Sequence, residues 1–163
     1  MKLYHGSTLE VRKPSLRYGR ERTDFGKGFY TTTIAEQAER WANIKKDRLQ
    51  SAKAVVSVYE INDAILTNPD FRIREFVGVD ESWLNFVVRC RKEKTTEHDY
   101  DIVFGPVAND NVFTTVNMYE SGLLGVEAAI AQLKAYKTYD QISFHTPIAI
   151  KELRFVESYL VEL

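Results

Sequence analysis

Phe25-Gly26-Lys27-Gly28-Phe29-Tyr30-Thr31-Thr32-Thr33 is the stretch around which the rest of the sequence is organised. Two glycines bracket a lysine, and an aromatic, threonine-rich segment follows directly. Glycine allows close approaches and backbone conformations that other residues resist, and β-branched and aromatic residues favour strands. The stretch therefore predicts a tight turn that leads into a strand at 29–33. Such a turn can press an aromatic ring against a flat ligand, although a glycine pair alone more often marks an ordinary turn.

The composition is that of an ordinary globular protein. The chain has 163 residues, which is within the usual size of one domain, so we expect a single domain over residues 1–163. Hydrophobic residues make up 44% of the chain, and 22 basic against 23 acidic residues give a formal charge of -1. This balance gives no global electrostatic argument for binding DNA or RNA.

Positive charge is nevertheless concentrated between residues 10 and 27. Six basic and three acidic residues leave this segment with a net charge of +3. The basic residues are Arg12, Lys13, Arg17, Arg20, Arg22 and Lys27. Residues 8–27 are expected to form a long loop, which could contact phosphate groups or simply present a solvated surface.

The cysteine content and the absence of long apolar segments indicate the compartment. Cys90 is the one cysteine, so no internal disulfide forms and a reducing compartment fits. It lies next to the apolar run 83–88, which predicts a packed core thiol rather than a nucleophile. The amino terminus lacks an apolar signal region, and no run is long enough to cross a bilayer. We therefore expect a cytoplasmic protein that does not enter a membrane.

Hydrophobic periodicity predicts the order of the helices and strands. Strands are expected at 1–7, 29–33, 54–61, 71–76, 100–107, 140–145 and 153–161, with that at 71–76 the weakest. Helices are expected at 34–49, from 80 or 82 to 91, at 109–120 and at 126–136. Thr33 is the expected N-cap of the first helix. This mixed order favours an α+β fold with antiparallel sheets packed by helices.

Alternation along the strand at 140–145 predicts which of its residues share a face. Gln141, Ser143 and His145 are expected to point one way, and Ile142 and Phe144 the other. Ile142 and Phe144 would then face a hydrophobic core, and the three polar residues would be available to a polar site.

Four short blocks of sequence resemble a known group of enzymes. The blocks are Tyr4-His5-Gly6-Ser7, Asp24-Phe25-Gly26-Lys27-Gly28-Phe29-Tyr30, Asp101-Ile102-Val103-Phe104-Gly105-Pro106-Val107 and Asp140-Gln141-Ile142-Ser143-Phe144. Together they resemble the ADP-ribosyltransferase superfamily, in its diphtheria-toxin-like and poly(ADP-ribose)-polymerase-like branch, and more narrowly the bacterial and phage DUF3990 family. The resemblance implies a split β-sandwich of two small, mainly antiparallel sheets with flanking helices.

The resemblance implies an NAD site formed by residues on separate strands. His5 would hold the adenosine-side ribose of NAD, and the backbone of Gly6 would bond the nicotinamide amide. Tyr30 would stack on the nicotinamide ring. The cofactor-binding residues that we expect are His5, Gly6, Ser7, Arg20, Lys27, Gly28, Tyr30 and Trp41.

Two further groups complete the expected site. Trp41 lies eleven residues after Tyr30, where a second aromatic ring commonly completes the sandwich around the nicotinamide. The apolar face of its helix also includes Trp41, so a place in the core is equally compatible with the sequence. The basic loop could clamp the pyrophosphate of NAD through Arg20, Arg22 or Lys27.

Gln141 departs from the family pattern. The resemblance puts it where a glutamate usually binds the ribose 2′-hydroxyl and favours the cation-like sugar that forms as nicotinamide leaves. The amide keeps its hydrogen-bonding capacity but has no charge. Charge directed at a developing ion is worth roughly 3 kcal/mol, by analogy with an oxyanion hole. The adjacent Asp140 should face the other side of the strand, which makes it a poor replacement.

The resemblance therefore implies an NAD-dependent ADP-ribosyltransferase with His5, Tyr30 and Gln141 as catalytic residues. It would move ADP-ribose from NAD to a protein or nucleic acid and release nicotinamide, with NAD glycohydrolase activity as the weaker option. Two alternatives stay open: an NAD-binding pseudoenzyme and a partner-binding module on the same fold. Family context adds a toxin-like role with a cognate immunity or antitoxin partner. His98 and His145 lack metal-motif spacing, so no metal is expected.

Overall fold

The computed structural model describes residues 1–20, 23–92, 98–108, 110–135 and 140–162. Within these ranges the strands are β1 (Lys2–Ser7), β2 (Phe29–Thr31), β3 (Val55–Glu60), β4 (Ile73–Glu75), β5 (Ile102–Pro106), β6 (Asp140–Phe144) and β7 (Arg154–Leu160). The helices are α1 (Ala35–Leu49), α2 (Glu81–Lys92), α3 (Asp110–Glu120), α4 (Val126–Lys134) and α5 (Pro147–Ile150). The expected α+β class is confirmed.

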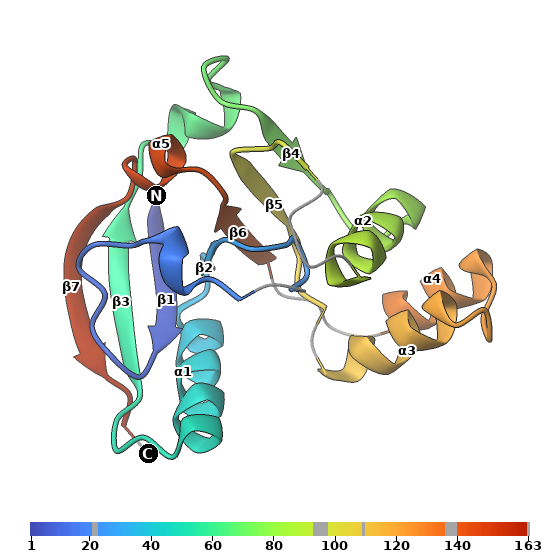
Figure 1. Cartoon of the computed structure of the whole chain (residues 1–163), viewed down its shortest axis with the longest axis horizontal. Coiled ribbons are helices and arrows are strands. Elements are labelled where there is room, and N and C mark those ends of the chain that lie inside the picture. Colours follow the sequence, from blue (N-terminus) through green and yellow to red (C-terminus); the bar gives the residue numbers. More distant parts are fainter. Residues whose placement is uncertain (21–22, 93–97, 109, 136–139, 163) are drawn as a thin grey trace.

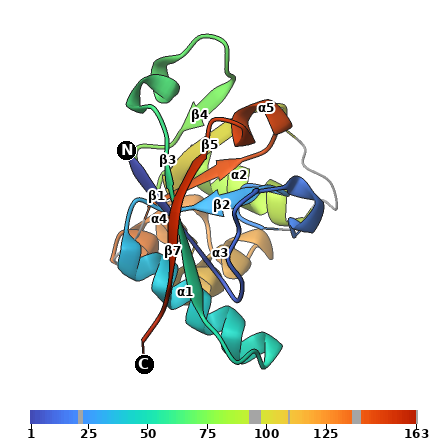
Figure 2. The same ribbon diagram turned by 90° about the vertical axis from the view of Figure 1, so that its left-hand side faces the viewer.

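The strands form two sheets that lie side by side (Figure 1). One has the order β1-β3-β7 and is antiparallel, and the other has the order β2-β6-β5-β4. In the second sheet only the β4–β5 pair is parallel. An isolated bridge between Tyr4 and Thr32 joins the two sheets where β1 and β2 meet. Two views at right angles place α1 and α5 at opposite ends of the sheets (Figure 1, Figure 2).

The described elements follow the expected order closely, and the differences involve short segments. The weak strand expected at 71–76 is reduced to Ile73–Glu75. Sequence reasoning missed α5 and two short 3-10 helices, Leu16–Tyr18 in the long loop and Asp63–Thr67 after β3. A single helical turn has too few residues to show the 3.6-residue period on which a helix prediction depends.

The expected N-cap at Thr33 is wrong. Helix α1 begins at Ala35, and its N-cap, Ile34, makes no side-chain hydrogen bond to the helix. The hydroxyl of Thr33 instead donates to Asp140 Oδ2 at 2.5 Å, and its amide donates to Asp140 Oδ1 at 3.1 Å. The carboxylate of Asp140 on β6 therefore accepts both hydrogen bonds that Thr33 donates. A carboxylate is a stronger hydrogen-bond acceptor than a neutral group.

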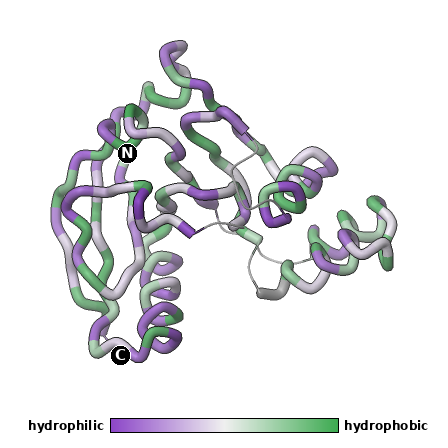
Figure 3. The backbone as a smooth tube through the Cα atoms, in the orientation of Figure 1, coloured by the Kyte–Doolittle hydropathy of each residue, from purple (hydrophilic) through white to green (hydrophobic). Residues whose placement is uncertain are grey.

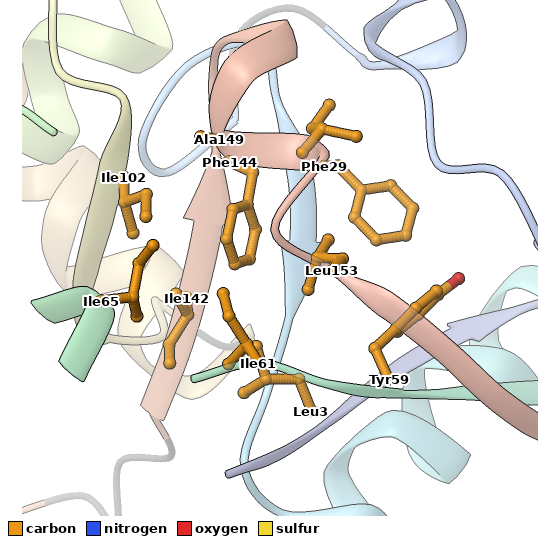
Figure 4. Packing of buried hydrophobic residues seen from close by; sticks show 11 residues of the cluster. Leu3, Phe29, Tyr59, Ile61, Ile65, Ile102, Ile142, Phe144, Ala149 and Leu153 are labelled. Carbon is orange, nitrogen blue, oxygen red and sulfur yellow. The ribbon is translucent and has the colours of Figure 1, made fainter. Parts of the chain in front are cut away.

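A hydrophobic core fills the space between the two sheets (Figure 4). Leu3 and Tyr59 enter it from the first sheet, and Phe29, Ile142 and Phe144 enter it from the second. The alternation expected along β6 is confirmed, since Ile142 and Phe144 lie in this core. Each such side chain contributes about 1.5–3 kcal/mol when it is fully removed from water.

A second core lies between the larger sheet and helices α2, α3 and α4. It contains Trp83 and Val87 of α2, Val103 of β5, Val116 of α3 and Leu133 of α4. Cys90 is also buried, at 2% exposure, in agreement with the expected core thiol. None of the described helices is both long enough and apolar enough to cross a membrane.

Helix α1 lies unusually close to β1. The helix is largely hydrophilic (Figure 3), and it buries Ala38 and Ala42 on the side that faces the strand. A Cβ atom on Gly6 would lie 2.0 Å from the carbonyl oxygen of Ala38 and 2.7 Å from the amide nitrogen of Ala42. Only glycine allows this approach, because the atoms in the way belong to the helix backbone.

Replacing Gly6 with alanine should therefore push α1 away from β1. We expect Gly6→Ala to lower the free energy of unfolding by about 3 kcal/mol or more, as overpacked cores do. Gly78→Ala is the matched control, because a Cβ there meets no atom within 4 Å. Urea denaturation of both variants checks this, and equal stability of the two would contradict the close approach.

Candidate functional site

His5 lies on β1 and is held by the neighbouring strand. Its Nδ1 donates to the carbonyl oxygen of Tyr30 at 2.6 Å, and its ring stacks on Phe29 with centroids 4.2 Å apart. Burial, and then the charge of Lys45, lower the pKa of His5 from 6.5 to about 3. The imidazole is therefore neutral near pH 7, and its Nε2 is left as a hydrogen-bond acceptor.

Lys45 of α1 contacts β1 at Gly6, the residue after His5. Its Nζ donates to the carbonyl oxygen of Gly6 at 2.7 Å. Burial, and then the charges of Arg20 and Arg48, lower the pKa of Lys45 from 10.5 to about 8. None of the ion pairs among the described residues includes Lys45. Lys45 therefore adds positive charge to this edge of β1, and no carboxylate among the described residues forms an ion pair with it. No motif in the sequence singles out Lys45.

Tyr30 holds the glycine-rich turn in place. Its hydroxyl donates to the carbonyl oxygen of Gly26 at 2.5 Å and accepts from the amide of Phe25 at 3.0 Å, and Thr23 Oγ1 lies 2.8 Å away. Burial raises the pKa of the Tyr30 phenol far above its ordinary value, so the hydroxyl stays protonated. Gly26 has a φ of 83°, which explains the glycine at this turn.

Gly28 makes room for a histidine of the opposite strand segment. A Cβ on Gly28 would lie 2.7 Å from Nδ1 of His145. That Nδ1 donates to the carbonyl oxygen of Lys27 at 2.8 Å, so Nε2 accepts from the hydroxyl of Ser143 at 2.7 Å. Burial, and then His98, lower the pKa of His145 from 6.5 to about 3. The pair resembles a serine–histidine dyad, but Ser143 is completely buried and offers no access to a substrate.

Gln141 belongs to a buried polar cluster centred on Asp24. The amide of Gln141 donates to Asp24 Oδ2 at 3.0 Å and to the carbonyl oxygen of Pro106 at 3.4 Å. The same carboxylate accepts from Arg91 Nε at 3.0 Å and from the amide of Ala108 at 2.8 Å. Gln141 is 3% exposed and Asp24 is 8% exposed. Sequence reasoning missed the roles of Asp24 and Arg91, because residues so far apart in the chain leave no local pattern.

The structure brings some of the expected site residues together and separates others. The side chains of Tyr30 and Gln141 both bond to residues of the turn 23–26. Phe29 and Tyr30 point to opposite faces of β2, so His5, stacked on Phe29, touches Tyr30 only at its backbone carbonyl. Trp41 is half-buried on α1, and no ring contact within the described residues pairs it with Tyr30.

The remaining expected residues lie in three different places. Ser7 ends β1 opposite Val55, and Arg20 is exposed in the long loop. Lys27 contributes its backbone carbonyl to His145. Arg22, one of the three basic residues expected at a pyrophosphate, lies outside the described residues.

Gln141→Glu should destabilise the protein, because it places a second carboxylate about 3 Å from Asp24 in a buried position. We expect a loss of about 3 kcal/mol near pH 7, typical of an uncompensated buried charge. Burial and Asp24 would raise the pKa of the introduced carboxyl, so the loss relative to the wild type should shrink as the pH falls. Gln132→Glu on the exposed face of α4 is the matched control. Denaturant unfolding at two pH values measures both, and a neutral effect would contradict the cluster.

His5 and His145 should make the protein sensitive to mild acid. Both have a pKa of about 3 in the folded state and about 6.5 when unfolded, so the unfolded chain binds more protons below about pH 6.5. Stability is then lost as the pH falls from about 6.5 towards 3, by up to about 1.4 kcal/mol per pH unit for each histidine. Urea midpoints measured between about pH 7 and 5, above the range of most carboxyl groups, test this. His145→Gln should flatten the profile, and a flat wild-type profile would refute the expectation.

The comparisons with known proteins agree with the family that the four sequence blocks suggest. No curated protein and no solved structure matches the chain. A family model described as "Protein of unknown function (DUF3990)" matches residues 1–155. This range contains β1, the glycine-rich turn, Lys45, the Asp24 cluster and β6, and so includes every residue of the candidate site described above. The chain therefore belongs to the DUF3990 family.

Proposed function

We propose that the protein is an NAD-dependent ADP-ribosyltransferase whose NAD site lies at the β1 edge of the junction between the two sheets. The resemblance of its sequence blocks to that superfamily is the first support. A second support is the arrangement of the sheets, which separate beyond the isolated bridge between Tyr4 and Thr32, with His5 and Gly6 next to it on β1. We propose the split β-sandwich of that superfamily as the fold.

The half-buried ammonium of Lys45 is the observation on which the proposal rests most. Lys45 lies beside His5 and Gly6, two of the residues expected to contact NAD, and Arg20 and Arg48 are close enough to lower its pKa. Partial burial disfavours the charged ammonium, and none of the ion pairs among the described residues compensates it. A bound anion would stabilise that charge. The pyrophosphate of NAD supplies negative charge of the required kind, and a lysine on a flexible four-carbon stem can turn from the Gly6 carbonyl towards it.

The protonation state of His5 suits the proposed role. Because Nδ1 donates to Tyr30, the free Nε2 can accept a hydrogen bond from a ribose hydroxyl. The carbonyl of Gly6, once released by Lys45, can accept from the nicotinamide amide. The bond between the ribose C1′ and the nicotinamide nitrogen would then break, and neutral nicotinamide would leave with the electron pair. A nucleophile of the acceptor would bond to C1′ and lose its proton to solvent, in a reaction with oxocarbenium character.

A second candidate, NAD binding without turnover, is favoured by the surroundings of Gln141. Its amide is buried and bonded to Asp24, and the charge of Asp24 is already paired with Arg91. In this arrangement neither side chain presents a free negative charge to a cation-like sugar. The two candidates share the NAD site and differ only in the chemical step.

Lys45→Met tests the shared site. We expect it to weaken NAD binding about tenfold or more, because a charge-assisted contact to phosphate is lost. Lys53→Met, at an exposed position outside the site, is the control and should leave the affinity unchanged. Calorimetric titration with NAD measures both variants, and thermal unfolding shows whether they remain folded. Failure of the wild type to bind NAD at millimolar concentration would refute the site.

Release of nicotinamide separates the two candidates. With NAD labelled in the nicotinamide ring, the transferase should release label, and release should increase when a cell lysate supplies the acceptor. Mass spectrometry should then find one added ADP-ribose unit on a lysate component. Saturable binding of NAD without release, in the presence of lysate, would select the binding module instead.

A further inference from the structure

A cavity of about 350 Å³ lies next to the glycine-rich turn, which His98 in its wall contacts at Phe25. It opens between β4, α2 and the segment that leads into β5, and its wall includes Arg74, Phe76, Phe86, Arg89, His98 and Tyr100. None of the residues expected to bind NAD lines it. Its volume is near the lower end of the range for small-molecule sites, about 300–1,000 Å³.

Aromatic rings form much of the cavity wall. Phe86 is the centre of the group, with ring centroids 5.1 Å from Phe76, 5.2 Å from His98 and 6.3 Å from Tyr100. His98 and Tyr100 lie 5.5 Å apart with a tilt of 37°. Phe86, His98 and Tyr100 are all only partly buried, and all three line the cavity. A flat aromatic group can stack on such a wall.

Two arginines add positive charge to the same cavity. Arg74 lies over the ring of Phe76 at 4.6 Å and donates to the hydroxyl of Ser82 at 2.6 Å. None of the ion pairs within the described residues includes Arg74, although guanidinium has five donors. Asp99, which also lines the cavity, is paired with Arg72 at 2.9 Å, so its charge is compensated. Arg89 is the second guanidinium of the wall.

His98 is fixed as a neutral part of this wall. Its Nδ1 accepts from the amide of Tyr100 at 3.1 Å, so its Nε2 carries the hydrogen and donates to the carbonyl oxygen of Phe25 at 2.8 Å. The amide of the same Phe25 donates to the hydroxyl of Tyr30. Phe25 thus connects the cavity wall to the side chain of Tyr30, on the opposite face of β2 from Phe29 and the stacked His5. His98 therefore offers no positive charge to a ligand, and the positive charge of the wall comes from its arginines.

We propose that this cavity binds a nucleoside 5′-monophosphate group, with the base stacked on the rings of Phe86 and Tyr100 and the phosphate held by Arg74 and Arg89. Aromatic rings and arginine side chains in the lining of one cavity match the two halves of such a ligand, since arginine binds phosphate in a fork and bases stack on aromatic side chains. The volume suits one nucleotide. This site is distinct from the NAD site and does not depend on it.

Calorimetric titration of the full chain with each of the four nucleoside 5′-monophosphates tests the proposal. At least one should bind saturably, and the matching nucleoside and inorganic phosphate should each bind more weakly. Arg74→Gln should weaken binding about tenfold, through loss of a charge-assisted hydrogen bond. Tyr100→Leu should weaken it roughly tenfold, through loss of stacking. Arg154→Gln on β7, outside the cavity, should leave the affinity unchanged.

A second pair of variants separates this cavity from the NAD site. Nucleotide binding that survives Lys45→Met and is lost in Arg74→Gln supports the proposal, whatever the outcome with NAD. Binding lost in Lys45→Met and kept in Arg74→Gln would assign the nucleotide to the β1 edge and overturn the proposal. Absence of saturable binding, binding of inorganic phosphate as tight as that of any nucleotide, or tighter binding of a phosphotyrosine peptide would overturn it as well. Thermal unfolding confirms that each variant is folded.

Discussion

The buried carboxylate of Asp24 is the constraint on which the larger sheet and its helices depend. It accepts hydrogen bonds from Arg91 of α2, from the amide of Ala108 after β5 and from Gln141 of β6. Arg91 also lies over the ring of Phe113 on α3. One ion therefore connects a loop, a sheet and two helices. Its burial is tolerable only because each oxygen is satisfied, since a buried charge that loses a partner destabilises a fold by about 3–5 kcal/mol.

The same cluster sets the position of the glycine-rich turn, which begins beside Asp24. The hydroxyl of Tyr30 bonds to the amide of Phe25 and to the carbonyl of Gly26, and His98 in the cavity wall bonds to the carbonyl of Phe25. This short segment is thus held between the side chain of Tyr30 and the wall of the aromatic cavity. A rigid support of this kind is what a binding site needs, because poorly held side chains lose affinity to conformational entropy.

Sequence patterns were sufficient for most of the secondary structure. Alternation placed Ile142 and Phe144 in the core, and the period of apolar residues located the four longer helices. Thr33 shows where local rules fail: it has the composition of an N-cap, but Asp140, more than a hundred residues away in the chain, binds its hydroxyl. For the candidate site, the sequence indicated His5, Gly6 and Tyr30 through a family resemblance, and the family itself is confirmed.

The sequence by itself determined the α+β class, the order of the elements, the family and the need for glycine at the turn. These follow from local propensity, from periodicity and from short blocks of neighbouring residues, all of which are written along the chain. Only the tertiary structure decided that Gln141 is bonded to Asp24, that Lys45 contacts Gly6 and that Arg74 and Tyr100 share a cavity. Contacts of this kind depend on how the sheets and helices pack. Side chains that meet across the fold are far apart in the sequence, so no local pattern predicts that they will be in contact.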